Sequence, residues 1–275
     1  MFFVEILKAI LFGVVEGVTE WLPISSTGHM ILLDELIRLD MSADFYETFS
    51  VVIQLGAILA VAVGYWHMLS PVGKDKKERK QIYRLWGMML LGVLPSAAVG
   101  LLLDDWLDEH LYNPTTVSVM LIVWGVGFIV IELAKKGLQP RLSELSEITP
   151  AFAIYTGLFQ VLALIPGTSR SGATILGAYI LGASRTLAAE YSFLLALPTM
   201  AGAGLLKTAK FIIHGNIPTA RELCLLAVGS ATAFLLSLAV IKFLTAFVKK
   251  HSFSGFGAYR IILGAVALLY FFARN

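Results

Sequence analysis

Residues 13–30, GVVEGVTEWLPISSTGHM, place two carboxylates, an imidazole and a run of hydroxyls within an apolar chain. Glu16 and Glu20 are four residues apart, so on a helix they lie one turn apart on the same face. Two anions in that arrangement repel each other unless a cation or a shared proton intervenes. Pro23 disfavours a helical Leu22 and predicts that the helix ends there. Residues 25–28 are then expected to form a short, hydroxyl-lined loop with free backbone N–H groups, which suits a phosphate.

The composition indicates where this stretch lies. Hydrophobic residues make up 57% of the 275 and charged residues only 15%, whereas soluble domains have roughly 45–50% apolar residues. The sequence therefore predicts a polytopic membrane protein. The net charge of +2 argues against a nucleic-acid partner, and the single Cys224 excludes an internal disulfide or a cysteine metal cluster. Glu5, Glu16 and Glu20 argue against a cleavable signal peptide.

Hydropathy predicts an all-α fold with six transmembrane helices and two re-entrant hairpins. Six segments have about the 20 apolar residues that a crossing needs: 45–66, 85–103, 115–134, 191–213, 222–244 and 259–272. Two further apolar stretches, 1–22 and 151–165, each run into a loop containing proline and hydroxyl residues and then into a second short apolar run. We expect each of these to form a helix–loop–helix hairpin that enters and leaves the membrane on one side.

The charges of the connecting segments predict the orientation. Basic residues gather in residues 67–84 (Lys74, Lys76, Lys77, Arg79, Lys80 and Arg84), in residues 135–150, and at Lys242, Lys249 and Lys250. These should be cytoplasmic. Residues 104–114, whose acidic run at 104–109 we interpret as a solvated loop, should lie outside. The first hairpin then enters from outside, the second enters from the cytoplasm, and both termini lie outside. Arg185 and Glu190 are expected to form an ion pair at the membrane boundary.

The opposed hairpins favour an inverted repeat of halves 1–134 and 144–275 within a single membrane domain. Three pairs share an offset of 143 residues: Pro23 with Pro166, Ser26 with Ser169, and Glu47 with Glu190. The partner of the opening stretch is PGTSRSGAT, residues 166–174, which carries Arg170 among hydroxyls. The planar guanidinium of arginine suits phosphate oxygens. If the two loops meet near the midplane, their side chains form a set suited to phosphoryl transfer.

Two patterns in this chain resemble a known family. EGxxExxPxSSTGH at 16–29 and PGxSRSGAT at 166–174 are similar to the two signature motifs of undecaprenyl-diphosphate phosphatases of the bacitracin-resistance type. The similarity extends along nearly the whole chain and includes VIQLG around Gln54, Arg185 in GxSR, and Tyr259–Arg260. It implies a bacterial inner-membrane enzyme that removes the terminal phosphate of undecaprenyl diphosphate, recycles the lipid carrier for peptidoglycan synthesis and confers bacitracin resistance.

The resemblance and the residues together predict a site. We expect catalytic roles for Glu20, Ser26, His29 and Arg170, with Glu16 and Glu20 holding a divalent cation, Mg²⁺ by preference. Substrate-binding roles are expected for Ser25, Thr27, Gly28, Gln54, Thr168, Ser169, Ser171 and Gly172. His29 would act as a general acid or base. The attacking group stays open between Ser26, giving a phosphoserine, and a water activated by His29 or a glutamate.

Other interpretations and partners are left open at this point. Inverted repeats with broken helices are typical of transporters, so a polyprenyl-phosphate or anion transporter or flippase is the alternative function. A transporter, however, has little use for two carboxylates and a histidine beside an anion site. The expected partners are the polyprenyl diphosphate substrate and bilayer lipids, with no nucleic acid, and a homodimer is left open. The site is expected to face outside.

Overall fold

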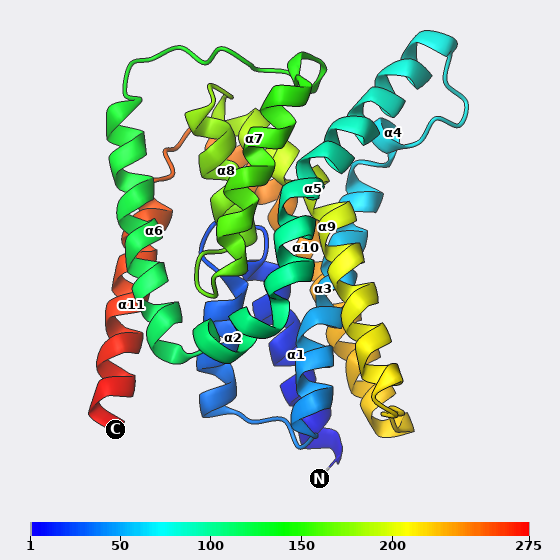
Figure 1. Cartoon of the computed structure of the whole chain (residues 1–275), viewed down its shortest axis with the longest axis vertical. Coiled ribbons are helices and arrows are strands. Elements are labelled where there is room, and N and C mark those ends of the chain that lie inside the picture. The colour runs from blue at the N-terminus through cyan, green and yellow to red at the C-terminus, as the bar shows by residue number, and fades with distance from the viewer. Residues whose placement is uncertain (1, 275) are drawn as a thin grey trace.

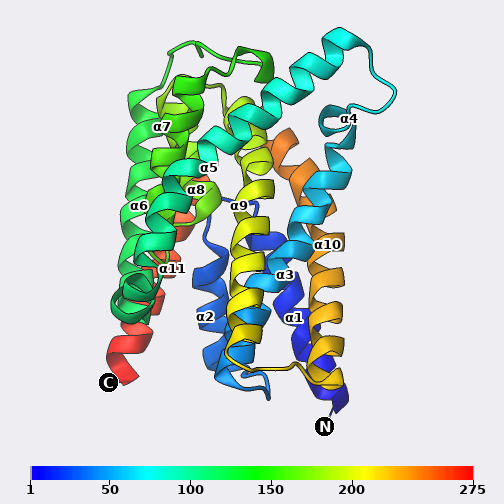
Figure 2. The same ribbon diagram turned by 45° about the vertical axis from the view of Figure 1, so that its right-hand side comes forward.

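The computed structural model describes residues 2–274, apart from the side chains of residues 43, 104, 105, 108 and 274. Within that part, six helices are long and apolar enough to cross a membrane, as the hydropathy predicts. They are α3 (Ala43–Gly64), α5 (Lys76–Leu111), α6 (Pro114–Ala134), α9 (Arg185–Ile213), α10 (Ala220–Val248) and α11 (Ser254–Arg274). Figures 1 and 2 show them as an upright bundle with both termini at the same end. The chain is an all-α, multi-pass membrane protein.

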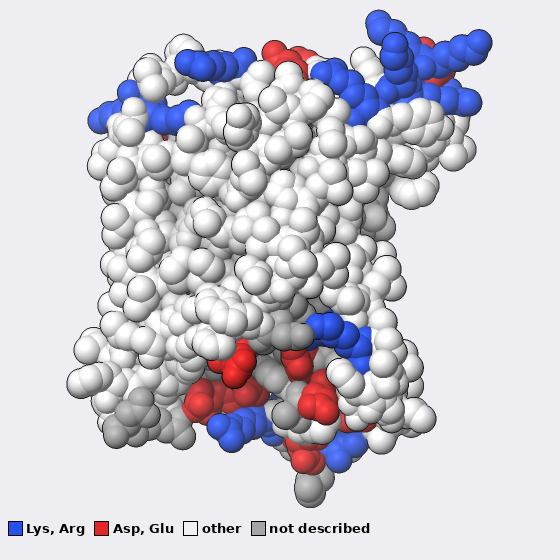
Figure 3. Space-filling view, in the orientation of Figure 1, with Lys and Arg blue, Asp and Glu red and all other residues white. Residues whose placement is uncertain are grey.

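The two ends of the bundle differ in charge. Lys and Arg gather at the upper end in Figure 3, and the lower end, which holds both termini, carries acidic side chains with a few basic ones. Between them lies a broad band almost free of charge on the face shown. We call the upper end the basic end and the lower end the terminal end. An uncharged band of this kind is the surface that a bilayer requires.

Two helix–loop–helix units fill the interior. The first consists of α1 (Phe2–Thr19) and α2 (Ser26–Leu36); the second of α7 (Pro150–Val161), the short 3₁₀ helix η2 (Leu162–Leu164) and α8 (Arg170–Ile180). The first unit enters from the terminal end and the second from the basic end, with their loops inside the bundle (Figures 1 and 2). Three of their α-helices are too short to cross, since a crossing takes about 20 residues. This arrangement is consistent with re-entrant hairpins.

The first hairpin differs in detail from the expectation. Helix α1 ends at Thr19, before Pro23, and residues 20–24 form turns. Ser26, Thr27 and Gly28 are not a loop, because they form the first turn of α2, with Ser25 as its N-cap. The free backbone N–H groups are therefore those of a helix N-terminus, which favours an anion for the same reason as the expected loop.

Helix α5 also runs further than expected. Residues 104–111 are helical rather than a solvated loop, so that expectation is wrong. The helix begins at a capping box formed by Asp75 and Glu78. No glycine or proline interrupts residues 101–113, and Asn113 then caps α6 at Pro114. The helix therefore continues until the next cap stops it.

Helix pairs related by the expected repeat pack in matching ways. Helix α1 packs along α10, as α7 packs along α5, and α6 lies against α11. Both hairpin contacts depend on glycine, because a Cβ on Gly17 would lie 2.7 Å from the Ala233 carbonyl oxygen and one on Gly157 would lie 2.2 Å from that of Gly92. Small residues at such positions let helix backbones approach closely.

Arg185 pairs with Glu132, not with Glu190 as expected. Its Nε donates to Glu132 Oε1 at 2.8 Å and its Nη2 to Oε2 at 2.6 Å. Residues five apart on a helix do not share a face, so Glu190 points away from Arg185. The end of α6 instead presents Glu132, which also accepts the Phe253 N–H at 2.7 Å. This ion pair ties α6, α9 and the start of α11 together at the basic end.

Candidate active site

The loops of the two hairpins meet inside the bundle in matching conformations. Ser25 and Ser169 are the only non-glycine residues with positive φ in the described part, at 73° and 75°. Each caps the next helix by accepting the N–H of a glycine three residues on, Gly28 at 3.3 Å and Gly172 at 3.0 Å. Positive φ is rare outside glycine and persists only where the surroundings enforce it. The equivalent of Ser169 is therefore Ser25 rather than Ser26, since the second loop holds one more residue between its proline and its capping serine.

Arg260 on α11 holds both loops in place. Its side chain is fully buried and donates to the carbonyl oxygens of Pro23 at 3.1 Å, Gly167 at 2.8 Å and Thr168 at 2.9 Å. These bonds from Nη1 and Nη2 of a buried guanidinium fix the positions of the carbonyls, because losing them would leave several buried polar groups unpaired. The sequence analysis noted Arg260 but gave it no role. The available signal was a lone arginine within an otherwise uncharged segment.

Three of the predicted catalytic residues come together where the loops meet. Arg170 Nη2 lies 2.8 Å from Glu20 Oε1, and the Ser26 hydroxyl donates to Glu20 Oε2 at 2.5 Å. Arg170 also donates to the Ser192 carbonyl at 2.8 Å, which orients its guanidinium. The Ser171 hydroxyl donates to the Glu20 carbonyl at 2.8 Å and so joins the second loop to the first. All of these groups are largely withdrawn from solvent, where charge-assisted hydrogen bonds are strong.

A cavity of about 690 Å³ borders residues next to this cluster, although Glu20, Ser26 and Arg170 are not part of its lining. Glu16, Thr27 and Gln54 line it, together with acidic residues nearer the terminal end (Asp34, Glu35 and Glu47) and Lys207. Glu16 is buried, and its Oε1 has no hydrogen-bond partner in the described part of the chain. The cavity thus joins the expected cation ligand Glu16 to two of the expected substrate-binding residues.

The donor set fits a cation only in part. The unpartnered oxygen of Glu16 is available, but both oxygens of Glu20 already have partners, Arg170 and Ser26. Among the described residues, no group of three His, Cys, Asp or Glu side chains is close enough to hold an ion alone. A cation here would rest on Glu16, share Glu20, and take its remaining ligands from substrate oxygens and water.

His29 bonds to groups outside the cluster. Its Nδ1 is 2.7 Å from the Ser25 carbonyl oxygen and its Nε2 is 2.7 Å from the Tyr259 hydroxyl, with the two rings stacked 5.7 Å apart. A carbonyl can only accept, so Nδ1 carries a proton, and in a neutral ring Nε2 accepts from Tyr259. The described contacts of His29 do not include Glu20 or Arg170, and its role as acid or base stays a prediction.

Several expected binding residues have local structural partners. Ser25 and Ser169 are helix caps, Gly28 and Gly172 supply the N–H groups that they accept, and Ser171 bonds Glu20. Thr168 is buried, and its hydroxyl is without a partner among the described residues. The backbone of these residues forms the junction between the two loops, and their substrate-binding roles stay predictions.

Comparison with known proteins identifies the family of this chain. The family model described as bacitracin resistance protein BacA matches residues 9–266. The chain belongs to the BacA family. Over 98% of its length it is 53% identical to an undecaprenyl-diphosphatase of Enterococcus faecalis, covering 99% of that protein. It is 50% identical to one from Streptococcus thermophilus over 98% of this chain and 94% of the relative. With one from Limosilactobacillus fermentum it shares 52% over 97% of this chain and 98% of the relative.

Proposed function

We propose that this chain hydrolyses undecaprenyl diphosphate to undecaprenyl phosphate and inorganic phosphate. The observation that carries the proposal is the buried cluster of Arg170, Glu20 and Ser26, with separations of 2.8 and 2.5 Å, next to the cavity that Glu16 lines. The names of the BacA-family relatives support the substrate. The reaction recycles the lipid carrier for peptidoglycan synthesis. An abundant enzyme confers resistance to bacitracin, which sequesters the diphosphate.

The diphosphate is bound by positive groups from both hairpins. Arg170 offers its guanidinium to the terminal phosphate while keeping its bond to the Ser192 carbonyl. The first turns of α2 and α8 add backbone N–H groups, and helix N-termini favour phosphate. These donors are held rigidly by Arg260, so they stabilise the charge that develops on the transferred phosphoryl group without first having to reorganise.

The attacking group is either Ser26 or a water. In the covalent route, the Ser26 oxygen forms a bond to the terminal phosphorus, its proton passes to Glu20 Oε2, and the bond to the bridging oxygen breaks to release undecaprenyl phosphate. Water then hydrolyses the phosphoserine. In the direct route, Glu20 takes the proton from a water instead. The 2.5 Å bond between Ser26 and Glu20 supports the covalent route.

A divalent cation, Mg²⁺ by preference, is part of the proposal. Glu16 and Glu20 would hold it, and when bound it supplies positive charge to neutralise phosphate oxygens. The unpartnered Oε1 of Glu16 supports this assignment. Removal of divalent ions with EDTA should stop phosphate release, and Mg²⁺ should restore it. Full activity in EDTA would contradict the proposal that the reaction needs a divalent cation.

We place the protein in the bacterial inner membrane with its site facing outside. The basic end faces the cytoplasm, because cytoplasmic segments carry the excess of Lys and Arg. The cavity beside Glu16 then opens toward the outer face, where the lipid diphosphate is left after polymer assembly.

Trapping the intermediate separates the two chemical routes. Purified protein is given polyprenyl diphosphate labelled with ³²P at the terminal phosphate and quenched in acid. Label on the wild-type protein and loss of turnover in Ser26→Ala are expected from the covalent route. Turnover that persists in Ser26→Ala assigns the attack to water. Binding of the lipid without phosphate release under any cation would instead favour a transporter.

A further inference from the structure

A second large cavity lies at the basic end. It has a volume of about 790 Å³ and is walled by the ends of α6, α8 and α10, the start of α9, and the segment that follows α6. Its charged lining consists of five cations and one carboxylate: Lys135, Lys136, Arg141, Arg185 and Lys249, with Glu132. None of these residues takes part in the candidate active site.

The one carboxylate in this cavity is already neutralised. Glu132 receives two hydrogen bonds from Arg185, at 2.8 and 2.6 Å, and a third from the Phe253 N–H. Lys135 donates to the carbonyl oxygens of Tyr179 and Ile180, which carry no charge to balance it. The lining of this cavity therefore supplies no further carboxylate to balance its remaining cations.

Two of these cations have no ion-pair partner among the residues that the structure describes. Lys136 and Arg141 are exposed and form no ion pair with any described residue. Partial burial and the charge of Arg141 lower the pKa of Lys135. An anion bound in the cavity would reduce the repulsion between Lys135 and Arg141. Hydroxyl residues (Ser184, Thr186, Ser252 and Ser254) line the same cavity, and α9 and α11 begin there, adding the positive ends of two helix dipoles.

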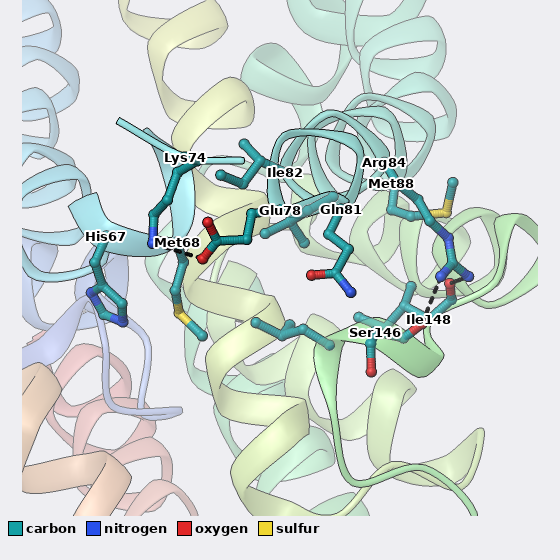
Figure 4. Close-up of a pocket in the computed structure, with 12 residues that line it drawn as sticks. His67, Met68, Lys74, Glu78, Gln81, Ile82, Arg84, Met88, Ser146 and Ile148 are labelled. Carbon is teal, nitrogen blue, oxygen red and sulfur yellow. Dashed lines mark hydrogen bonds and ion pairs between the residues drawn. The ribbon is translucent and has the colours of Figure 1, made fainter. Parts of the chain in front are cut away.

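A smaller cavity of the basic end serves as a contrast. It measures about 250 Å³ and is lined by Lys74, Glu78 and Arg84 among others (Figure 4). Its cations already have partners within the protein. Lys74 pairs with Glu78 at 3.3 Å. Arg84 donates to the carbonyl oxygens of Ser146 and Ile148. Basic residues at this end of the molecule do not by themselves make an anion site.

The larger cavity also lies at the right depth for a membrane lipid. The apolar crossing of α6 ends at Ala134, and Lys135 and Lys136 follow directly. Basic pockets between helices at this level bind phospholipid headgroups. We infer that this cavity binds a phosphate anion, carried either by the headgroup of an anionic phospholipid or by free inorganic phosphate. This site is separate from the proposed hydrolysis and would tie the loops of the basic end to the membrane.

Thermal unfolding in detergent tests the inference. The wild type is compared with Lys136→Gln/Arg141→Gln and with the matched control Lys77→Gln/Lys80→Gln, which removes two exposed cations of the same end outside both cavities. The probes are short-chain phosphatidylglycerol, phosphatidylcholine of the same chain length and inorganic phosphate. Phosphatidylglycerol should raise the Tm of the wild type and the control by roughly 5 °C at saturation. The Lys136→Gln/Arg141→Gln variant should lose this rise.

Each arm of the experiment has a defined meaning. A rise with inorganic phosphate but not with phosphatidylglycerol, lost in the same variant, supports the site and assigns its phosphate to solution. An equal rise of the Tm in both double variants shows diffuse charge attraction and overturns the inference. The inference is also overturned if neither phosphatidylglycerol nor inorganic phosphate raises the Tm of the wild type. Both substituted residues are exposed, so the variants are expected to fold, and unchanged phosphate release in detergent would verify this.

Discussion

Arg260 acts on the candidate active site through backbone carbonyls. Its guanidinium bonds the Pro23 carbonyl of one loop and the Gly167 and Thr168 carbonyls of the other. Glu20 and Arg170, which we propose to be catalytic, lie within or beside those loops, so their separation depends on the bonds made by Arg260. Small displacements of reacting groups are costly to catalysis.

We expect Arg260→Lys to lower phosphate release by about 10²-fold, because an ammonium cannot reproduce the planar set of three bonds. Substrate binding should weaken less, since Arg170 is unchanged. The measurement is steady-state kinetics on protein verified as folded by its circular dichroism. A folded Arg260→Lys variant with the kcat of the wild type would contradict this positioning role of Arg260.

The pair of His29 and Tyr259 allows a test of coupling. If His29 acts only in the orientation that Tyr259 gives it at 2.7 Å, the two residues form one unit. His29→Ala and Tyr259→Phe should each reduce kcat, and the double variant should be no slower than His29→Ala alone. Fully additive losses would show that Tyr259 acts independently of the imidazole.

Close packing of helix backbones holds the hairpins in position. Gly157→Ala would bring a Cβ to 2.2 Å from the Gly92 carbonyl oxygen, where backbone must move. We expect a loss of about 1–3 kcal/mol in unfolding free energy and a lower Tm in detergent. Gly87→Ala on α5 is the matched control, because nothing lies within 4 Å of its added Cβ. There the gain in helix propensity should leave the Tm unchanged or higher. Equal Tm values in the two variants would contradict close packing of α5 and α7.

The six crossings and part of the candidate site could be predicted from the sequence, and two arginine contacts could not. Apolar length alone identified all six crossings, because a bilayer imposes that length on any spanning helix. Glu20, Ser26 and Arg170 were placed in one site because the two opposed hairpins were expected to meet near the midplane. Arg260 was missed, since its partners are backbone carbonyls that no sequence pattern marks. Arg185 was paired with the wrong glutamate, because its true partner, Glu132, lies on a helix distant in sequence.

The inverted repeat remains a prediction that the packing supports. Helices α1 and α7 lie against α10 and α5, which are equivalents under the expected halves 1–134 and 144–275. The matched caps at Ser25 and Ser169 point the same way. Within this scheme only the first hairpin carries carboxylates: the place of Glu20 is taken by Gln160, which is buried and bonds Ser96 at 2.7 Å. One half supplies the acid groups and the other supplies Arg170.

At the scale of the whole molecule, the charge asymmetry predicts the orientation. With Cys224 replaced by Ala, single cysteines at Lys77 and Ile217 would report on the basic end and on the connection between α9 and α10 at the opposite end. The reagent is a membrane-impermeant maleimide, added to bacterial cells whose outer layers have been removed and whose inner membrane is intact. It should label Ile217→Cys and not Lys77→Cys. The reverse pattern would place the candidate active site on the cytoplasmic side.

The most direct test of the account is phosphate release from a polyprenyl diphosphate by the purified protein in detergent. Wild type, Glu20→Gln, Arg170→Ala and the exposed control Lys77→Ala are compared, each with its Tm measured. The account predicts release by wild type and Lys77→Ala, and a loss on the order of 10²–10³-fold in the other two, with folding retained. Release that survives in folded Glu20→Gln and Arg170→Ala would contradict the claim that their ion pair is the catalytic centre.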